Sequence, residues 1–316
     1  MPILRASLHP AKTLFMDPLA LPRPDYSHPY PLGQVYRPVL PTALWPAEQA
    51  AESDAVANSE AAAGLKEALP PQPNAFWAQP FRAEPVRMGD FVGATALGGV
   101  VNFFDWWLNP HGNGTHTECV GHISKERIVL CDCLTHFAFY ADVVTVAPRE
   151  LPAPAPFSGR DAVVTAADLQ AAVQGLTAKL GAAAQSSPAL ASPARASPPL
   201  ALVLRTAPEA ERRNRHWTGT NAPYVEAAAC AWLADQGYDH LLLDLPSVDR
   251  EADQGLLAAH HAWWRYPHAT RMQATITEMI VVPDALPDGR YWLHMQVAQV
   301  AMDAAPSNPV LYRLGD

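Results

Sequence analysis

Proline placement is the strongest constraint that this sequence puts on its fold. The chain of 316 residues contains 32 prolines, about twice the usual share. Many of them cluster near the N-terminus and around residues 148–156 and 188–208. Because proline lacks an amide N–H and fixes its own φ, it interrupts helices and central strands. The proline clusters are therefore expected to be connectors, with the regular elements between them.

Segments typical of strands and of helices alternate between these connectors. Runs rich in Val, Ile, Leu and Phe predict sheet at 91–104, 128–130, 143–146, 200–205, 240–245, 274–282 and 291–300. Helices are predicted from a cap at Thr165 to about residue 180, and from Asn221 to Gly237. This alternation is typical of a mixed α/β domain.

The chain divides into an N-terminal arm and one folded domain. Residues 1–72 predict an irregular, proline-rich arm that includes an Ala/Glu-rich surface helix near 46–69. Residues 73–316 hold the strand and helix segments and form the predicted domain. Within it, residues 181–199 have almost no large apolar side chains, so they cannot offset their ordering entropy. A flexible low-complexity loop is predicted there.

Composition and charge exclude several classes of protein. The sequence is 49% hydrophobic, which is enough for a sizeable core. Its formal net charge is −9 and it has no basic stripe, so nucleic acid is not expected as a partner. No apolar run reaches membrane-spanning length, and the first residues lack the pattern of a secretory signal. We therefore expect no membrane association and a cytoplasmic location.

The cysteines are too few and too unevenly placed for a disulfide framework in a chain of this length. They are expected to be reduced thiols, at positions 119, 131, 133 and 230. Cys131 and Cys133 are separated by one residue, which fits neither a redox motif nor a zinc knuckle. Burial in strands is the prediction for these thiols.

A cluster of histidines and acids between residues 109 and 122 is the main candidate for chemistry. The stretch reads NPHGNGTHTECVGH, in which proline and glycine disfavour a regular helix. His116 and Glu118 lie two residues apart, so in an extended segment both point to the same side and can bind one divalent cation. His122 is near enough in a turn to move a proton. The alternative is that the His116/Glu118 pair only braces the turn.

A second group of polar residues follows later in the chain. Residues 244–249 read DLPSVD, a strand end that runs into a turn, and His260, His261 and Glu278 come after it. Loops that follow strands commonly carry the site of an α/β fold. A histidine of this group together with Glu278 completes a set of nitrogen and oxygen ligands suited to zinc or manganese.

With these residues in view, the sequence resembles the cyclase-like metal-dependent hydrolases, whose best-known members are the bacterial kynurenine formamidases. The signature of that family is His-x-Gly-Thr-His-x-Asp-x-Pro-x-His. Residues 114–118 and His122 match it in register, with Glu118 in place of the aspartate. The later matches, at residues 243–249, His260, His261 and Glu278, come in the same order, and the likeness covers roughly residues 74–300.

The resemblance implies a fold, a site and an activity. The fold is an α/β, swivelling β/β/α-type single domain with a mixed sheet and flanking helices, usually a homodimer with the site near the subunit contact. The implied metal ligands are His116, Glu118, His260 and Glu278, with His122 as general acid/base. The implied activity is hydrolysis of a small amide, ester or lactone, with metal-bound water as the nucleophile.

Departures from the signature fall at its first and last parts. The first histidine of the family falls on Gly112, and the nearest histidine, His111, is one residue out of register. His111 is therefore an additional candidate ligand, since the glycines around it permit unusual backbone angles. The proline before the last histidine is absent. Glu278 follows His260 by 18 residues, which is more than expected, and His261 is a possible substitute for His260.

Three functions are compatible with these residues. The first is a formamidase-like hydrolase that cleaves the carbon–nitrogen bond of a linear amide. The second is a cyclase or dehydratase on the same fold, and the third is a non-catalytic protein that binds a small molecule with a degenerate metal site, which Gly112 favours. Aromatic residues beside the motifs predict a pocket for a flat or apolar acyl group, with core packing as the alternative. The pocket candidates are Phe76, Trp77 and Trp217.

Overall fold

The computed structural model describes residues 24–34, 36, 72–186 and 200–314. The predicted surface helix near 46–69 and most of the predicted loop at 181–199 lie outside the described residues. The first six residues of that loop, 181–186, instead complete a long helix, α3 (Ala166–Ser186). The predicted cap holds, because Thr165 Oγ1 accepts the Asp168 N–H at 3.2 Å and donates to the Asp168 carboxylate at 2.7 Å.

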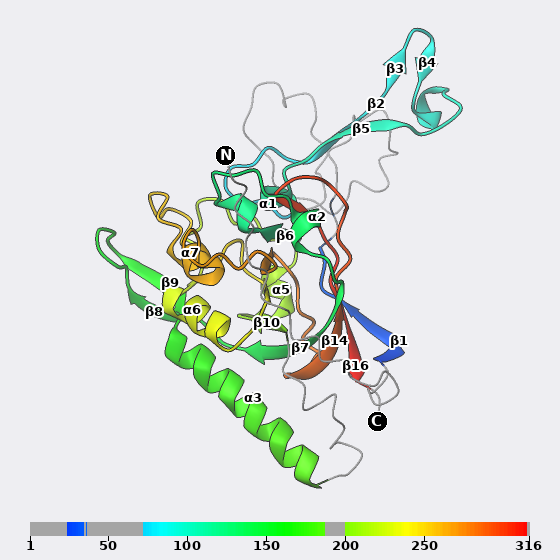
Figure 1. Cartoon of the computed structure of the whole chain (residues 1–316). Coiled ribbons are helices and arrows are strands. Elements are labelled where there is room, and N and C mark those ends of the chain that lie inside the picture. Colours follow the sequence, from blue (N-terminus) through cyan, green and yellow to red (C-terminus); the bar gives the residue numbers. More distant parts are fainter. Residues whose placement is uncertain (1–23, 35, 37–71, 187–199, 315–316) are drawn as a thin grey trace, which may run out of the picture.

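A nine-stranded mixed sheet, curled into a half-barrel, forms the body of the protein (Figure 1). Four parallel strands make its centre, and antiparallel strands flank them on both sides. The strands, in sheet order, are β1 (Pro24–Pro31), β16 (Val310–Leu314), β14 (Gly289–His294), β7 (Ala138–Thr145), β10 (Ala201–Arg205), β12 (His240–Leu243), β13 (Thr275–Glu278), β6 (His116–Cys119) and β15 (Ala304–Pro306).

Helices cover one face of this sheet. α3, α6 (Ala227–Asp235) and α7 (Ala258–Trp264) lie on the same side in Figure 1. Side chains alternate across the strands, so Leu241 and Leu243 of β12 join the core under the helices while Leu242 joins the core of the opposite face. The expected α/β class, with a mixed sheet and flanking helices, is therefore confirmed.

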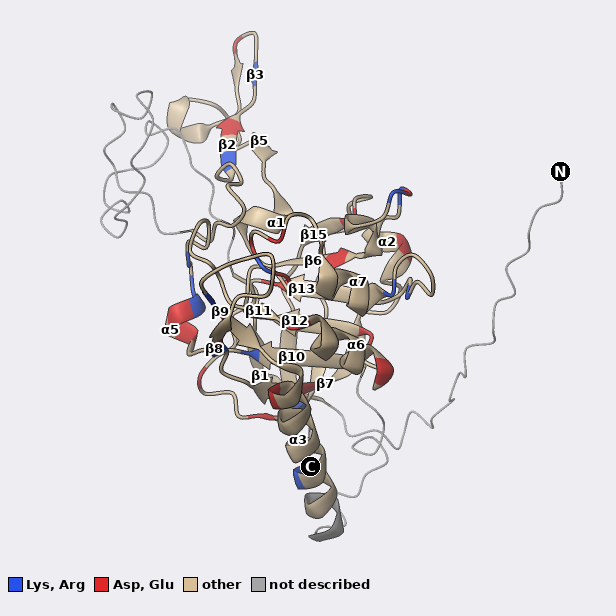
Figure 2. Ribbon diagram, turned by 90° about the vertical axis from the view of Figure 1, so that its left-hand side faces the viewer, with Lys and Arg blue, Asp and Glu red and all other residues tan. Residues whose placement is uncertain are grey.

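Smaller elements complete the described chain. A hairpin of β2 (Arg82–Pro85) and β5 (Phe104–Trp107), tipped by β3 (Arg87–Met88) and β4 (Phe91–Val92), projects from the body at the end opposite to α3 (Figures 1 and 2). A three-stranded sheet and short helices fill the remaining connections. They are β8 (Arg149–Pro152), β9 (Arg160–Val164), β11 (Tyr224–Val225), α1 (Pro110–Asn113), α2 (Leu130–Cys133), α5 (Glu209–Arg212), and the 3-10 turns η4 (Thr95–Leu97) and η5 (Val120–His122).

Several local predictions are wrong. Residues 128–130 do not form a strand, and Cys131 and Cys133 lie on the short helix α2, so only Cys119 of the motif region is a strand cysteine. The second helix begins at Ala227 because β11 first pairs with β9. Residues 24–31, expected to be irregular, form β1, which pairs with β16 at the edge of the sheet.

No helix in the described ranges is long and apolar enough to cross a membrane.

Candidate metal centre

Strand pairing brings the first motif beside Glu278. β6 and β13 run antiparallel, with His116 opposite Glu278 and Glu118 opposite Ile276. Directly paired residues of an antiparallel ladder point to the same face, so these three polar side chains gather on one side of the sheet. All three are almost completely buried, with at most 3% of each residue exposed. On the other side, Thr117 and Thr277 bond to each other through their hydroxyls at 2.8 Å.

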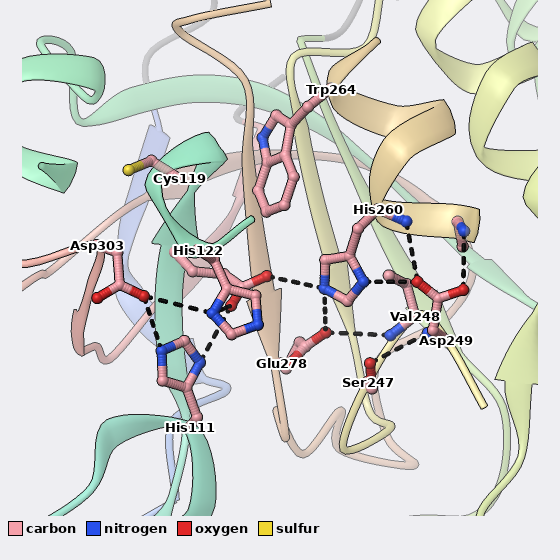
Figure 3. Close-up of polar contacts among 12 residues, drawn as sticks. His111, Cys119, His122, Ser247, Val248, Asp249, His260, Trp264, Glu278 and Asp303 are labelled. Carbon is pink, nitrogen blue, oxygen red and sulfur yellow. Dashed lines mark hydrogen bonds and ion pairs between the residues drawn. The ribbon is translucent and has the colours of Figure 1, made fainter. Parts of the chain in front are cut away.

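The first turn of α7 supplies His260 to this group. The backbone N–H groups of Ala259 and His260 donate to the Asp249 carboxylate at 2.8 and 3.0 Å, which fixes the start of the helix. The same carboxylate lies 2.6 Å from Nδ1 of His260. The other ring nitrogen, Nε2, therefore faces Oε1 of Glu118 at 3.2 Å and Oε1 of Glu278 at 3.9 Å (Figure 3).

Two further histidines approach Glu118 from the side opposite to His260. Nδ1 of His111, on α1, lies 3.1 Å from Oε2 of Glu118, and Nδ1 of His122 lies 3.7 Å from the same oxygen. The His111 and His122 rings stack with their centroids 4.3 Å apart. Both rings also contact Asp303, which lies just before β15 (Figure 3).

Steric crowding at Gly112 accounts for the shifted first histidine. A Cβ at this position would lie 2.2 Å from Cβ of Ala78 and 2.9 Å from the carbonyl oxygen of Ala75, far inside van der Waals contact. The Ala75 N–H also donates to the Gly112 carbonyl at 3.0 Å, which holds the two segments together. Position 112 therefore has no room for an imidazole, whereas His111, one residue earlier, reaches Glu118.

The carboxylates dominate the electrostatics of the cluster. Burial alone lowers the pKa of His260, but Asp249 and Glu118 overcome this and raise it to about 10. Burial is likewise outweighed at His111, where Asp303 and Glu118 raise the pKa to about 10. For Glu118, burial raises the pKa, and the neighbouring histidines bring it well below its usual range. The centre of the cluster thus favours positive charge.

The arrangement fits a divalent cation. Nε2 of His116 is buried without a hydrogen-bond partner, and ligand atoms of His116, Glu118 and Glu278 lie within 4.8 Å of one another. A second set, His111, Glu118 and His122, meets the same distance limit. Nitrogen and carboxylate oxygen ligands suit zinc and manganese.

Hydrogen bonding prepares His116 for this role. Its Nδ1 donates to the Gly114 carbonyl at 3.0 Å, so Nε2 of the neutral ring carries a lone pair. That lone pair faces Oε2 of Glu278 at 3.4 Å, and two acceptors repel each other unless a proton or a cation lies between them. Within the described ranges, the two buried glutamates have only histidines as ion-pair partners. A bound cation would therefore neutralise buried negative charge that is otherwise costly.

The remaining candidates lie around this centre or away from it. His261 faces the Tyr266 carbonyl through Nδ1 at 3.1 Å and does not join the cluster, so His260 is the histidine that the fold brings in. Phe76 and Trp77 are exposed by 36% and 67%, whereas Trp217 is buried. Their segments are adjacent, since the Trp217 N–H donates to the Asn74 carbonyl at 2.7 Å.

Two polar residues of the centre received no role from the sequence. Asp249 belongs to the second motif, and its spacing before His260 was visible but ambiguous, because Asp244 stands in the same motif. Asp244 instead accepts from Thr206 and lies 3.5 Å from Arg212, away from the cluster. Asp303 follows a stretch without any recognisable motif, so nothing in the sequence pointed to it.

The family follows from comparison with known proteins. Residues 25–250 match the model of the family described as "Putative cyclase". The chain belongs to this cyclase family. A search of curated proteins finds no match.

Several solved structures share the fold of this cyclase-family protein. Isatin hydrolase A from Labrenzia aggregata, bound to benzyl benzoate, gives a TM-score of 0.54 at 11% identity, covering 91% of this chain and 94% of the other. Isatin hydrolase A from Ralstonia solanacearum gives a TM-score of 0.52 at 13% identity, covering 90% of this chain and 92% of the other. A structure described as a novel cyclase gives a TM-score of 0.52 at 11% identity, covering 91% of this chain and 89% of the other.

Proposed function

We propose that this cyclase-family protein is a metal-dependent hydrolase of a small amide, ester or lactone. The observation that carries the proposal is the meeting of His116, Glu118 and Glu278 in a buried centre where His116 Nε2 lacks a hydrogen-bond partner. A cation held there would offset the cost of burying these carboxylates. Two solved structures with the same fold are described as isatin hydrolases, which supports the same class of activity.

Each ligand in this proposal has a position in the fold. His116, Glu118, Glu278 and His260 hold the cation, and His111 is a further ligand beside Glu118. Zinc or manganese is the proposed metal, because both accept imidazole and carboxylate. When bound, such a cation lowers the pKa of a coordinated water toward 7 and polarises a substrate carbonyl.

His122 is the proposed general acid/base. It is more exposed than the buried ligands, with 30% of its side chain accessible, so a substrate can reach it. Its Nδ1, and not its Nε2, is the ring nitrogen that faces Asp303 and Glu118. We propose that Nε2 takes the proton from the attacking water and gives it to the leaving nitrogen or oxygen.

The substrate side of the proposal is an aryl or otherwise flat acyl compound. Two of the structural relatives are isatin hydrolases, and isatin is a cyclic aryl amide. A linear aryl formamide, as in formamidases, presents a similar carbonyl next to an aromatic ring. We propose that the exposed Phe76 and Trp77 receive this ring, with the buried Trp217 contributing to the apolar wall from the adjacent segment.

One structural observation bears on the non-catalytic alternative, and the cyclase alternative needs an experiment. Gly112 favoured a non-catalytic binding protein, but the neighbouring His111 places Nδ1 3.1 Å from Glu118, so an imidazole is present beside the centre. A cyclase or dehydratase would use the same residues in the opposite direction, and only product analysis distinguishes it. A homodimer in the cytoplasm remains part of the proposal.

Metal analysis tests the proposal most directly. Purified wild-type protein should contain zinc or manganese by elemental analysis, and Glu118→Gln, which keeps the shape of the side chain, should lose most of it. Glu150→Gln is the matched control, because Glu150 lies exposed on β8. The loaded protein should then hydrolyse at least one of a panel of isatin, aryl formamides, esters and lactones.

Equal metal content in wild type and Glu118→Gln would contradict the ligand role. Metal retention with no hydrolysis of any compound, together with ring closure or dehydration of an open-chain substrate, would instead favour the cyclase alternative.

A further inference from the structure

Asp303 contacts both His111 and His122, the two histidines that lie outside the most buried part of the centre. Its Oδ2 lies 3.0 Å from Nε2 of His111 and 3.3 Å from Nδ1 of His122. Its backbone carbonyl accepts the Cys119 N–H at 3.0 Å, so the residue is anchored to β6, the strand that carries Glu118. One carboxylate oxygen therefore contacts both rings, as Figure 3 shows.

The surroundings of His122 determine which of its nitrogens carries hydrogen. Nδ1 faces Oδ2 of Asp303 at 3.3 Å and Oε2 of Glu118 at 3.7 Å, and both atoms are acceptors. A neutral imidazole beside two acceptors places its hydrogen on the nitrogen that faces them. Nε2 is then left with a lone pair, which is the form that a general base requires.

The same carboxylate acts on His111 through the opposite ring nitrogen. Here Nε2 faces Asp303, and Nδ1 faces Oε2 of Glu118 at 3.1 Å. Both nitrogens of His111 thus face carboxylate oxygens, so without a cation each of them carries a hydrogen. A cation bound beside Glu118 would replace the hydrogen on Nδ1, while Asp303 would keep the other hydrogen on Nε2. The two rings stack at 4.3 Å, so a change in the orientation of one ring affects the other.

We propose that Asp303 is a positioning residue that sets opposite tautomers in two adjacent histidines. It holds His122 with a free Nε2 for proton transfer and, when a cation is bound beside Glu118, it keeps the hydrogen of His111 on Nε2 so that Nδ1 can bind the metal. The kinetic part of this inference rests on the proposed hydrolase function, whereas the tautomer part does not require any activity. Asp249 has the corresponding contact with His260, at 2.6 Å, on the other side of Glu118.

The test compares Asp303→Ala and Asp303→Asn with the wild type in the full-length chain. Asp303 is partly exposed, with 28% of its side chain accessible, and its backbone bond to Cys119 does not depend on the side chain. Asp235→Ala is the matched control, because Asp235 is an exposed aspartate at the end of α6, paired with Arg265. Circular dichroism checks that each variant is folded.

Nitrogen NMR of metal-free protein, with imidazole nitrogens labelled and His122 assigned through His122→Gln, reports the tautomer directly. In Asp303→Ala, His122 should shift from Nδ1–H alone to a mixture of both tautomers. Asp303→Asn retains a neutral acceptor, so it should shift less. For the metal-loaded proteins, kcat should fall about 10- to 100-fold in Asp303→Ala, with a smaller fall in Asp303→Asn. KM should change much less than kcat.

An unchanged His122 tautomer in Asp303→Ala would overturn the proposal. Loss of metal from Asp303→Ala with the tautomer unchanged would also overturn it, because Asp303 would then be a ligand. A shifted tautomer in protein that hydrolyses nothing, even as wild type, would support the positioning role and refute the hydrolase function.

Discussion

Substitution of Gly112 by alanine tests whether crowding at this position explains the shifted histidine. The added Cβ would lie 2.2 Å from Cβ of Ala78 and 2.9 Å from the Ala75 carbonyl oxygen. Neither atom belongs to a flexible side-chain end, so the backbone of α1 or of residues 75–78 must move. Overpacking of this kind typically costs about 1–3 kcal/mol of the free energy of unfolding. Gly112→Ala should therefore be destabilised by that amount.

A control and a compensating change make the prediction sharp. Gly175 lies within α3, and a Cβ there meets nothing within 4 Å. Gly175→Ala should stabilise the protein by about 0.5–1 kcal/mol, because glycine is unfavourable inside helices. Ala78→Gly removes the closer of the two clashes, so in the Gly112→Ala background it should recover part of the loss.

Urea unfolding of the four proteins and of the double variant measures these differences. The coupling between positions 78 and 112 should fall in the range of about 0.5–3 kcal/mol that is found for residues in contact. Crowding at position 112 is refuted if Gly112→Ala is as stable as Gly175→Ala. It is also refuted if the changes in the free energy of unfolding caused by the substitutions at 78 and 112 simply add.

Two further predictions concern single histidines. His122→Ala should lower turnover by about a hundredfold to ten-thousandfold while the metal content by elemental analysis stays the same, and unchanged turnover would remove His122 from the mechanism. Burial, with Arg271 and His136 nearby, lowers the pKa of His240 to about 3. In the unfolded chain this histidine takes up a proton near pH 6.5, whereas in the folded protein it does so only near pH 3. The free energy of unfolding should therefore fall as the pH drops from about 6.5 to 3, by about 1.4 kcal/mol per pH unit for this group. His240→Asn should flatten that slope in urea titrations across this window, and an equally steep slope would contradict the assignment.

Local patterns predicted those parts of the structure that depend on local physics. The two-residue spacing of His116 and Glu118 required only that the segment be extended, and β6 is a strand. The apolar runs that became β10 and β12 are buried on both faces of a parallel sheet, which makes them conspicuous in the sequence. Such features do not depend on which other segment lies beside them.

Other parts were set by contacts between distant segments. Asp303 acquires its role only because β15 pairs with β6, more than 180 residues earlier in the chain. Only short pieces of the predicted sheet at 91–104 are strand, because the chain folds back on itself after β4. Gly99 comes so close to Val92 that a Cβ would lie 1.9 Å from the Val92 carbonyl oxygen, an approach that only glycine permits. The start of α6 was misplaced because Asn221 adopts a positive φ and the chain forms β11 before the helix.

The antiparallel placement of β6 between β13 and β15 has a consequence for how the protein acquires its cation. Residues 111 to 278 must come together before the full proposed ligand set exists, and closing such long loops is entropically expensive. No short fragment of the chain presents the complete set, so loading with metal follows the assembly of the tertiary structure. A chelator present during refolding should therefore leave the fold largely formed but empty, and metal added afterwards should fill it.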